Sequence, residues 1–475
     1  MDNMKQETMM KEFDQYAGEM TKKYQIPGFA MGLAKDGQLF YENDFGYRNI
    51  EKELPLSSNT VFGIGSVTKS FTCVAILQLQ EAGKLSVHDA VVKYLPEFKT
   101  NNEDYTKQMT IHHFMTHSAG IPPLPALTGA MRTSMLLDPT FEEEGKPDMD
   151  LSKIPSIETY EELMKDIANA DFTLLGAPGT EFSYSNDCYA LLGTIIERVS
   201  GISYEQYMKD YILDPAGMHQ SVFHYEELKG HEDVATLYNS RKKDEETIVF
   251  ESNNPWDAPA MRAAGFLKST INDMVKYSEI FRNNGKVDSV QILTPESVEL
   301  MTTPYIQCDH ERYYGYGLMI TPDYFGYRLI EHGGSIKGVA AQLNMIPELG
   351  LAGVSFTNLA GVPSTQLLYS AFAEQLGKSI HDCHFSLEEF DISPEKLNEF
   401  EGEFVSGEGS KVKLHVEAEK LHINVDGMQS IIKPIAEDTF LVNIKDSNLI
   451  LRFKRDEKGT IVRIKCGYRQ IPKVN

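Results

Sequence analysis

Apolar and polar residues recur along the chain with two different periods, which separate the expected helices from the expected strands. Within residues 5–24 apolar side chains return every three or four positions, and this period predicts an amphipathic helix. Residues 29–47 instead alternate apolar and polar side chains on both sides of Lys35-Asp36-Gly37. Because this tripeptide is a turn sequence, the alternation predicts an antiparallel hairpin.

The helical period returns after the hairpin. From Ser66 to Ala82 it runs over mostly apolar residues, so this helix is expected to be buried, and Gly83 is placed to end it. Further helices are predicted at 111–115, 160–168, 186–199, 274–281 and 364–376, and strands at 316–320, 340–347 and 353–358. A hairpin first, helices between and strands last predict an α+β fold, in which an antiparallel sheet carries helices on its faces and a helical subdomain lies beside it.

The segment 122–158 is long for a connection and is rich in proline, methionine and acidic residues. Two interpretations fit this composition. It is either a solvated surface loop, which is the simpler prediction, or an insertion that lies over a cleft.

The pattern changes after about residue 385. An acidic, helix-like stretch is followed by short alternating runs that turn sequences separate, and strands of this length and spacing predict a small antiparallel barrel or sandwich. We therefore expect two domains, residues 1–384 and residues 385–475. A chain of 475 residues also exceeds the size at which a single core stops growing, which agrees with this division. The short runs lie at 412–416, 421–425, 440–442, 449–453 and 461–464.

Composition narrows the classes of partner and compartment. The chain carries 45 basic and 69 acidic residues, a formal net charge of -24, which disfavours nucleic acid and anionic membrane surfaces as partners. Its five cysteines form no CxxC pair, so reduced thiols are expected rather than a zinc site or a disulfide framework. No signal-peptide pattern and no apolar run long enough to span a bilayer stand out. We expect a cytoplasmic protein, although a processed secreted form has the same sequence.

Ser66 and Lys69 open the predicted buried helix three residues apart. This spacing places both side chains on one face of the helix, within reach of each other. A serine hydroxyl is a weak nucleophile, and a lysine can take its proton only when burial lowers the lysine pKa. The free amides of the helix start could in addition stabilise an oxyanion. A helix cap followed by a surface lysine explains the same residues, so the pair alone is weak.

Two further motifs sit at expected element ends. Tyr184 and Asn186 precede the helix predicted at 186–199, where a phenol can relay a proton and an amide can hold a carbonyl. The alternative is a core tyrosine beside a helix cap. Glu331-His332-Gly333-Gly334-Ser335 opens a predicted strand, whose glycines allow a substrate to approach and whose Ser335 amide can donate to an oxyanion. A plain turn before a strand is the alternative.

Together, in this order and these contexts, the three motifs resemble the active site of the penicillin-recognising serine hydrolases. This family includes class C β-lactamases, low-molecular-mass penicillin-binding proteins, and related D-aminopeptidases and esterases. The similarity extends over roughly residues 20–380 and includes Phe62-Gly63-Ile64-Gly65-Ser66, the run Met115 to Ile121, and Ala264-Gly265-Phe266. It implies a β-lactamase/transpeptidase-like fold.

The resemblance also implies a role for each matching residue. Ser66 would form the acyl-enzyme, Lys69 and Tyr184 would exchange its proton, and Asn186 would bind the substrate amide. The oxyanion would lie between the amides of Ser66 and Ser335, on the strand that carries Gly334, and His332 would occupy the place of the third-motif cation. Which of the lysine and the tyrosine is the general base stays open. The resemblance implies no metal and no cofactor.

The third motif departs from the Lys-Thr-Gly that many β-lactamases carry. His332 is largely neutral at pH 7 unless it is paired, so the departure favours a peptide or ester substrate, with D-residues included. A β-lactamase or DD-carboxypeptidase acting on a β-lactam-like substrate is the first alternative, and a non-catalytic sensor or binding protein is the second. A triad built on His117 beside Ser118 is disfavoured, since that segment is structural in the family.

The C-terminal strands resemble the lipocalin-like barrel that some of these relatives carry. The stretch Phe400-Glu401-Gly402-Glu403-Phe404 is similar to the start of such barrels. In those relatives the barrel covers the cleft or mediates assembly. The sequence leaves open whether this chain forms a homo-oligomer.

Overall fold

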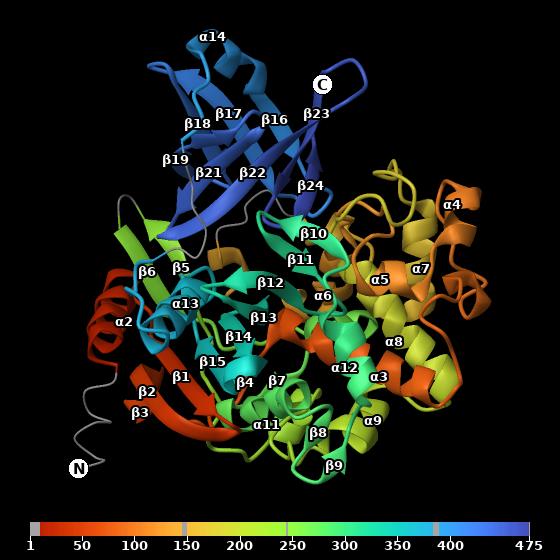
Figure 1. The fold of residues 1–475 in the computed structure, drawn as a ribbon, viewed down its shortest axis with the longest axis vertical. Coiled ribbons are helices and arrows are strands. Elements are labelled where there is room, and N and C mark those ends of the chain that lie inside the picture. The colour runs from red at the N-terminus through yellow and green to blue at the C-terminus, as the bar shows by residue number, and fades with distance from the viewer. Residues whose placement is uncertain (1–9, 145–149, 244–245, 383–388, 475) are drawn as a thin grey trace.

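The computed structural model describes residues 10–144, 150–243, 246–382 and 389–474. At its centre is a nine-stranded sheet with the order β10-β11-β12-β13-β14-β15-β1-β2-β3, in which every neighbouring pair is antiparallel (Figure 1). β1, from the start of the chain, thus lies beside β15, the last strand of this sheet in chain order. The strands are β1 (Gly28–Lys35), β2 (Gln38–Asn49), β3 (Leu54–Pro55), β10 (Ile306–Asp309), β11 (Arg312–Tyr314), β12 (Met319–Tyr324), β13 (Tyr327–Ile336), β14 (Val339–Ile346) and β15 (Leu351–Thr357).

The predicted N-terminal hairpin is confirmed as β1 and β2. Its register pairs Gly28 with Gly46 and Lys35 with Gln38, with one irregularity along β1. The two turn residues, Asp36 and Gly37, have φ of 49° and 77°. Positive φ at both central positions is what a tight two-residue hairpin turn needs, which explains the Asp-Gly sequence.

Helices cover both faces of this sheet. On one face α2 and α13 pack on β1 and its neighbours through a core that includes Phe13, Phe29 and Phe372. On the other face α3 and α11 are buried, and the rings of Phe71 and Tyr277 stack with their centroids 3.7 Å apart. The predicted first helix is confirmed from residue 11 onward, while its residues 5–9 lie outside the described part. The helices are α2 (Lys11–Lys23), α3 (Thr68–Glu81), α11 (Ile271–Arg282) and α13 (Ser364–Gln375).

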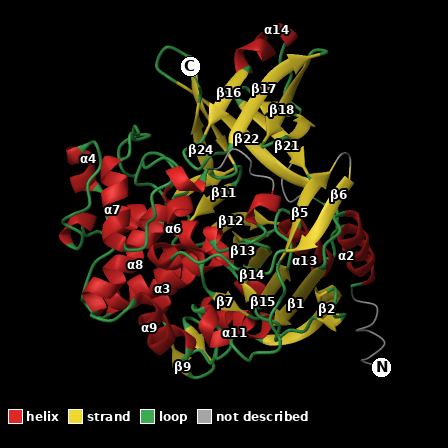
Figure 2. Ribbon diagram, turned by 180° about the vertical axis from the view of Figure 1, so that it is seen from behind, coloured by secondary structure: helices red, strands yellow, loops and turns green. Residues whose placement is uncertain are grey.

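A helical subdomain lies beside the sheet, with α8 near its centre (Figure 2). The helix predicted at 186–199 is confirmed as α8. Ser185 caps its start by accepting the Cys188 amide, and Gly201, with φ of 82°, ends it in the left-handed conformation. The other helices are α4 (Glu103–Gln108), α5 (Ile111–Met115), α6 (Ala126–Leu136), α7 (Tyr160–Asn169), α8 (Asn186–Ser200), α9 (Tyr204–Met208), α10 (Arg262–Gly265) and α12 (Pro295–Thr302), with short strands β4 (Phe62–Gly63), β5 (Tyr238–Lys243), β6 (Glu246–Glu251), β7 (Lys268–Ser269), β8 (Lys286–Val287) and β9 (Val290–Gln291).

The segment 122–158 contains a helix, and its prediction as a solvated loop is wrong over that helix. α6 (Ala126–Leu136) packs beside the buried Trp256 through Met131 and Met135. Leu127 and Met131 also line a cavity of about 540 Å³, so the alternative of an insertion at a cleft fits this half of the segment. Residues 145–149 lie outside the described part.

The C-terminal strands form two antiparallel sheets, of four and five strands, around a core of their own (Figure 1). Phe400, Phe404, Phe440 and Phe453 fill this core. The sheets approach each other where Phe404 bridges to Lys473, but the described residues form no continuous closed barrel. The boundary predicted at residues 384 and 385 lies outside the described residues. The elements are α14 (Pro394–Leu397), β16 (Gly402–Val405), β17 (Lys411–Glu417), β18 (Lys420–Val425), β19 (Met428–Ile431), β20 (Lys433–Ala436), β21 (Thr439–Ile444), β22 (Ser447–Arg455), β23 (Ile461–Cys466) and β24 (Arg469–Pro472).

Two further features concern the cysteines and the length of the helices. Four of the five cysteines lie in the described part of the chain, where all four are unpaired and three are buried. Burial raises the pKa of the Cys73 thiol to about 12, which makes it inert. Over the ranges that the structure describes, no helix combines the length and the apolar character needed to cross a bilayer.

Candidate active site

Ser66 lies where the backbone of β13 touches the entry to α3. It belongs to a single 3-10 turn, η1 (Gly65–Val67), that leads into the helix. A Cβ on Gly334 would lie 2.0 Å from the Ile64 carbonyl oxygen and 3.1 Å from the Ser66 nitrogen, and a Cβ on Gly65 would lie 2.6 Å from the Ser335 nitrogen. Only glycine fits at positions this close. The two glycines therefore bring the backbones around the Ser66 and Ser335 amides together, as an oxyanion hole requires.

Lys69, the second residue of α3, is fully buried one turn after Ser66. Its Nζ lies 3.1 Å from Ser66 Oγ, 2.9 Å from Asn186 Oδ1 and 2.5 Å from the Ala264 carbonyl oxygen. Burial, and secondly the charge of Arg469, lower the pKa of Lys69 well below its usual value. A neutral amine gives its two N–H groups to the two carbonyl oxygens, so its lone pair is left to face the Ser66 hydroxyl.

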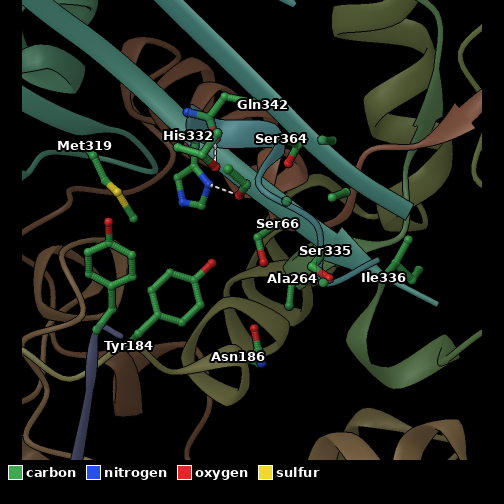
Figure 3. A pocket seen from close by; sticks show the side chains of 18 of the residues that line it. Ser66, Tyr184, Asn186, Ala264, Met319, His332, Ser335, Ile336, Gln342 and Ser364 are labelled. Atoms are coloured by element: carbon green, nitrogen blue, oxygen red, sulfur yellow. Dashed lines mark hydrogen bonds between the residues drawn. The ribbon is translucent and has the colours of Figure 1, made fainter. Parts of the chain in front are cut away.

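Tyr184 approaches Ser66 from the loop that precedes α8 (Figure 3). Two basic side chains lie over its ring, with Lys69 Nζ 4.7 Å and Arg469 Cζ 4.5 Å from the ring centroid. The buried hydroxyl makes no hydrogen bond of ordinary geometry within the described residues. Burial raises the pKa of Tyr184, while the Ser66 hydroxyl and Arg469 act in the opposite direction. The phenol therefore keeps its proton and is placed to donate it near Ser66.

Asn186 is the first residue of α8 and lies below Ser66 in Figure 3. Its Oδ1 accepts a hydrogen bond from Lys69. That contact fixes the amide plane and leaves the NH2 group as the part that can meet a substrate carbonyl. The asparagine thus orients the lysine and lines the cavity at the same time.

His332 is a buried, neutral side chain. Its Nδ1 lies 2.6 Å from the Gly333 carbonyl oxygen and its Nε2 lies 2.9 Å from the Tyr314 hydroxyl. Because a carbonyl only accepts, Nδ1 carries the proton and Nε2 accepts from the tyrosine. Burial, and secondly Lys69, lower the pKa of His332 to about 3. The imidazole is therefore uncharged, so His332 supplies no positive charge at this position.

The cation that faces Tyr184 comes from the C-terminal domain instead. Arg469 is the first residue of β24, and its guanidinium stacks on the Tyr184 ring and lines the cavity. It pairs with Glu408, with Nε 2.8 Å from Oε2. A positive charge thus stands on the Tyr184 side of Ser66, supplied by a residue that follows His332 by more than a hundred positions.

These groups share one cavity of about 540 Å³ (Figure 3). Six of the seven residues predicted for the site line it, and the seventh, Lys69, lies behind Ser66. The apolar side chains of Leu127, Met131 and Trp256 form part of the wall, and Arg312 and Glu331 form another part. The predicted residues that line the cavity are Ser66, Tyr184, Asn186, His332, Gly334 and Ser335.

His117 supports the Tyr184 loop. Its Nδ1 accepts the Ser185 amide at 3.0 Å, and its ring lies 4.1 Å from the Tyr184 ring, centroid to centroid. The neighbouring Ser118 hydroxyl bonds to the Thr116 hydroxyl at 2.8 Å. The pair therefore does not have the geometry of a serine-histidine triad, in keeping with the structural role expected for it.

One group of side chains that could ligate a metal ion lies on β17 and β18 of the C-terminal domain. It consists of His415, Glu417 and His422, whose ligand atoms lie within 4.8 Å of one another. None of the three lines the Ser66 cavity.

Comparison with known proteins places this site in a family. The sequence profile described as Beta-lactamase matches residues 13–374, which is most of the chain. The chain belongs to the beta-lactamase family. As a member of this family it is 27% identical over 285 residues to Protein flp of Staphylococcus aureus (strain MW2), an alignment that covers 58% of this chain and 52% of that relative. The chain thus spans about half the length of the curated relatives of this name that it matches.

Solved structures resemble this beta-lactamase family member over most or all of its length. The octameric penicillin-binding protein homologue from Pyrococcus abyssi is 28% identical, with a TM-score of 0.67 over 97% of this chain and 99% of that one. SurE, at 20% identity, has a TM-score of 0.69 and full coverage of both chains. A D-stereospecific amidohydrolase from Streptomyces sp., at 21% identity, has a TM-score of 0.61 over 77% of this chain and 99% of its own. The last two likenesses concern the fold alone.

Sequence reasoning missed two contributors to the cavity of this beta-lactamase family chain. Arg469 follows a turn, Gly467-Tyr468, that marks a hairpin but carries no catalytic motif. Nothing in the local pattern brings the last strands beside Tyr184, because that placement depends on how two domains dock. The sequence pattern also gave no indication that Trp256, the one tryptophan of the chain, lines the cavity.

Proposed function

We propose that this chain is a serine hydrolase that acts through an acyl-enzyme on a peptide or ester carbonyl, with D-residue substrates included. The observation that carries the proposal is the contact of 3.1 Å between Ser66 Oγ and the buried Nζ of Lys69, whose other two partners are both acceptors. Burial lowers the pKa of this lysine, which favours its action as a base.

The proposed reaction begins when Ser66 Oγ attacks the substrate carbonyl carbon and its proton passes to the lone pair of Lys69. The negative charge that develops on the carbonyl oxygen is stabilised by the amides of Ser66 and Ser335. Tyr184 gives its proton to the leaving group and is reprotonated from Lys69. Water then attacks the acyl-enzyme and gives a proton to the Lys69 and Tyr184 pair. The pair returns this proton to Ser66 Oγ as the bond between Ser66 and the acyl group breaks and the acid product leaves.

This assignment makes Lys69 the general base of acylation and Tyr184 the proton donor. The directions of the two pKa shifts support it, because burial makes the amine neutral and keeps the phenol protonated. Asn186 would hold the substrate amide as well as the lysine. His332, being neutral, would align the strand and the Tyr314 hydroxyl rather than supply charge.

A β-lactamase or DD-carboxypeptidase is the second candidate, and Arg469 favours it. A fixed positive charge beside Tyr184 can bind a substrate carboxylate, which neutral His332 cannot do. The Pyrococcus abyssi homologue is named for penicillin-binding proteins, which agrees with either candidate. The C-terminal domain would be of the lipocalin-like type, and an octamer such as that homologue forms is one assembly to test.

The experiment is a hydrolysis screen of the purified protein across D- and L-aminoacyl esters, short peptides and nitrocefin. D-residue substrates belong in the screen because SurE was solved with D-Leu. The proposal expects turnover of esters or peptides that is lost in Ser66→Ala. Faster nitrocefin turnover, also lost in Ser66→Ala, would move the assignment to the second candidate. Absence of Ser66-dependent turnover of all three classes would leave the non-catalytic alternative.

A further inference from the structure

The loop that carries Tyr184 is held by the C-terminal domain. The Tyr184 amide donates to the Tyr468 carbonyl oxygen at 3.1 Å, and Gln470 Nε2 donates to the Phe182 carbonyl oxygen at 2.9 Å. Both partners belong to the turn and strand that follow β23. In Figure 1 this β23–β24 end of the C-terminal domain faces the catalytic domain. The backbone at the tyrosine and two residues before it is therefore bonded to the C-terminal strands.

Glu181 is the point where these contacts converge. Its carboxylate accepts from Gln470 Nε2 at 2.8 Å, lies 3.2 Å from Arg463 Nη2 and lies 3.5 Å from Lys454 Nζ. The three partners come from three successive strands, β24, β23 and β22. About a fifth of the Glu181 side chain is exposed, so each ion pair alone is weak, but one carboxylate links three strands to one loop.

Tyr184 depends on such support because its own hydroxyl is not anchored. That hydroxyl makes no ordinary hydrogen bond within the described residues, so the position of the ring follows from the backbone of residues 181–185 and from the rings and cations packed on it. A shift of this loop would move the phenol away from Ser66. A displacement of about 1 Å at a catalytic group can cost about a hundredfold in rate.

We infer that Glu181 is a positioning residue for Tyr184, and that through it the C-terminal domain forms a working part of the active site. This inference rests on the proposed function, since it gives Tyr184 a part in the reaction. Glu181 touches no reacting atom and acts by tying the strands β22–β24 to the Tyr184 loop. The C-terminal domain is thus more than a cover over the cleft.

The chain offers a matched control at the same domain interface. Asp446 bonds to Lys23 and accepts from the Tyr24 hydroxyl at 2.7 Å, which joins the C-terminal domain to α2. Asp446→Asn removes one charge from an interdomain contact, as Glu181→Gln does, but at a place outside the Ser66 cavity. In Glu181→Gln the contacts of Asp446 with α2 remain, and in Asp446→Asn the contacts of Glu181 with the strands β22–β24 remain.

The experiment compares the full-length wild type, Glu181→Gln and Asp446→Asn. An alkyl fluorophosphonate labels the nucleophile, and the concentration dependence of labelling separates the maximal rate, kinact, from the half-saturating concentration, KI. Hydrogen exchange at the amides of residues 180–186 and thermal unfolding are measured on the same samples. We expect kinact of Glu181→Gln to fall at least tenfold with KI within about twofold of wild type, faster exchange at the Tyr184 amide, and Asp446→Asn to match wild type.

Wild-type labelling rates in Glu181→Gln, or equal losses in both variants, would overturn the inference. If Glu181→Gln does not fold, the double variant Lys454→Met/Arg463→Met removes both ion pairs of Glu181 from the other side and keeps its contact with Gln470. This variant is also expected to lower kinact at least tenfold. If the wild type is not labelled at all, the proposed function fails, and the exchange rates alone decide the positioning role. Unchanged protection at Tyr184 in Glu181→Gln would then reject it.

Discussion

Replacement of Arg469 by glutamine tests how the active site keeps Lys69 neutral. Arg469 Cζ and Lys69 Nζ lie 4.5 Å and 4.7 Å from the centroid of the same Tyr184 ring. The two charges are therefore at most about 9 Å apart, a distance at which charges inside a protein still interact strongly. Arg469 disfavours the ammonium form of Lys69, so Arg469→Gln should raise the pKa of Lys69. The unpaired carboxylate of Glu408 would act in the same direction.

The size of the effect follows from Coulomb's law. At about 9 Å and an effective dielectric constant of about 20, the interaction of two unit charges is about 2 kcal/mol. Since about 1.4 kcal/mol corresponds to a tenfold change in a protonation equilibrium, the neutral fraction of Lys69 below its pKa falls at least tenfold. The base must be deprotonated to act, so the acidic limb of the pH-rate profile moves to higher pH. Activity returns once the pH exceeds the raised pKa.

The assay is the pH dependence of acylation, followed by fluorophosphonate labelling between about pH 5 and pH 10, which brackets the range of a shifted lysine. Arg469→Lys keeps the positive charge and is the matched control. We expect an acidic limb displaced upward in Arg469→Gln and near its wild-type position in Arg469→Lys. A limb that stays in place or moves to lower pH in Arg469→Gln would refute the electrostatic reasoning.

Three further substitutions test other parts of the site and the fold. Gly334→Ala should lower kcat/KM at least a hundredfold, while the circular dichroism spectrum stays native. The new Cβ would meet the Ile64 carbonyl oxygen at 2.0 Å and displace β13, the strand that carries the Ser335 amide. Near-wild-type activity would contradict this geometry. Lys69→Met should lose activity by a factor of about a hundred or more. The variant should nevertheless unfold at a higher temperature, because folding at pH 7 no longer has to bury and neutralise an ammonium group. A lower Tm would count against a buried, neutral lysine. Phe404→Ala should destabilise the C-terminal domain by about 3 to 5 kcal/mol in denaturant unfolding, because its ring is fully buried. A change below about 1 kcal/mol would show that the core around this ring is loosely packed.

Local chemistry allowed much of the fold to be predicted from the sequence. The Asp36-Gly37 turn fixed the first hairpin, because few residues accept positive φ at two adjacent positions. The start and end of α8 were equally readable, since Ser185 caps its first turn and Gly201 ends its last. The helix α6 escaped prediction because proline and acidic residues around it suggested a loop, while its burial depends on Trp256 from a distant part of the chain.

In the candidate site, too, contacts set by local spacing were predicted, and contacts set by the packing of distant segments were not. Ser66 and Lys69 were found because a spacing of three on one helix determines their contact. A largely neutral His332 was predicted, but its burial and its contact with the Tyr314 hydroxyl could not be, since Tyr314 lies on β11, two strands away in the sheet. Arg469 could not be predicted either, because its position over Tyr184 is a property of how the two domains dock.

The central claim is that Ser66 is a nucleophile activated by a neutral Lys69. Intact-mass analysis of the full-length protein after treatment with a fluorophosphonate tests it most directly, with Ser66→Ala treated in parallel. We expect one adduct on the wild type, mapped to Ser66 by peptide sequencing, and none on Ser66→Ala. An unmodified wild-type mass, or an adduct of equal yield on Ser66→Ala, would contradict the assignment.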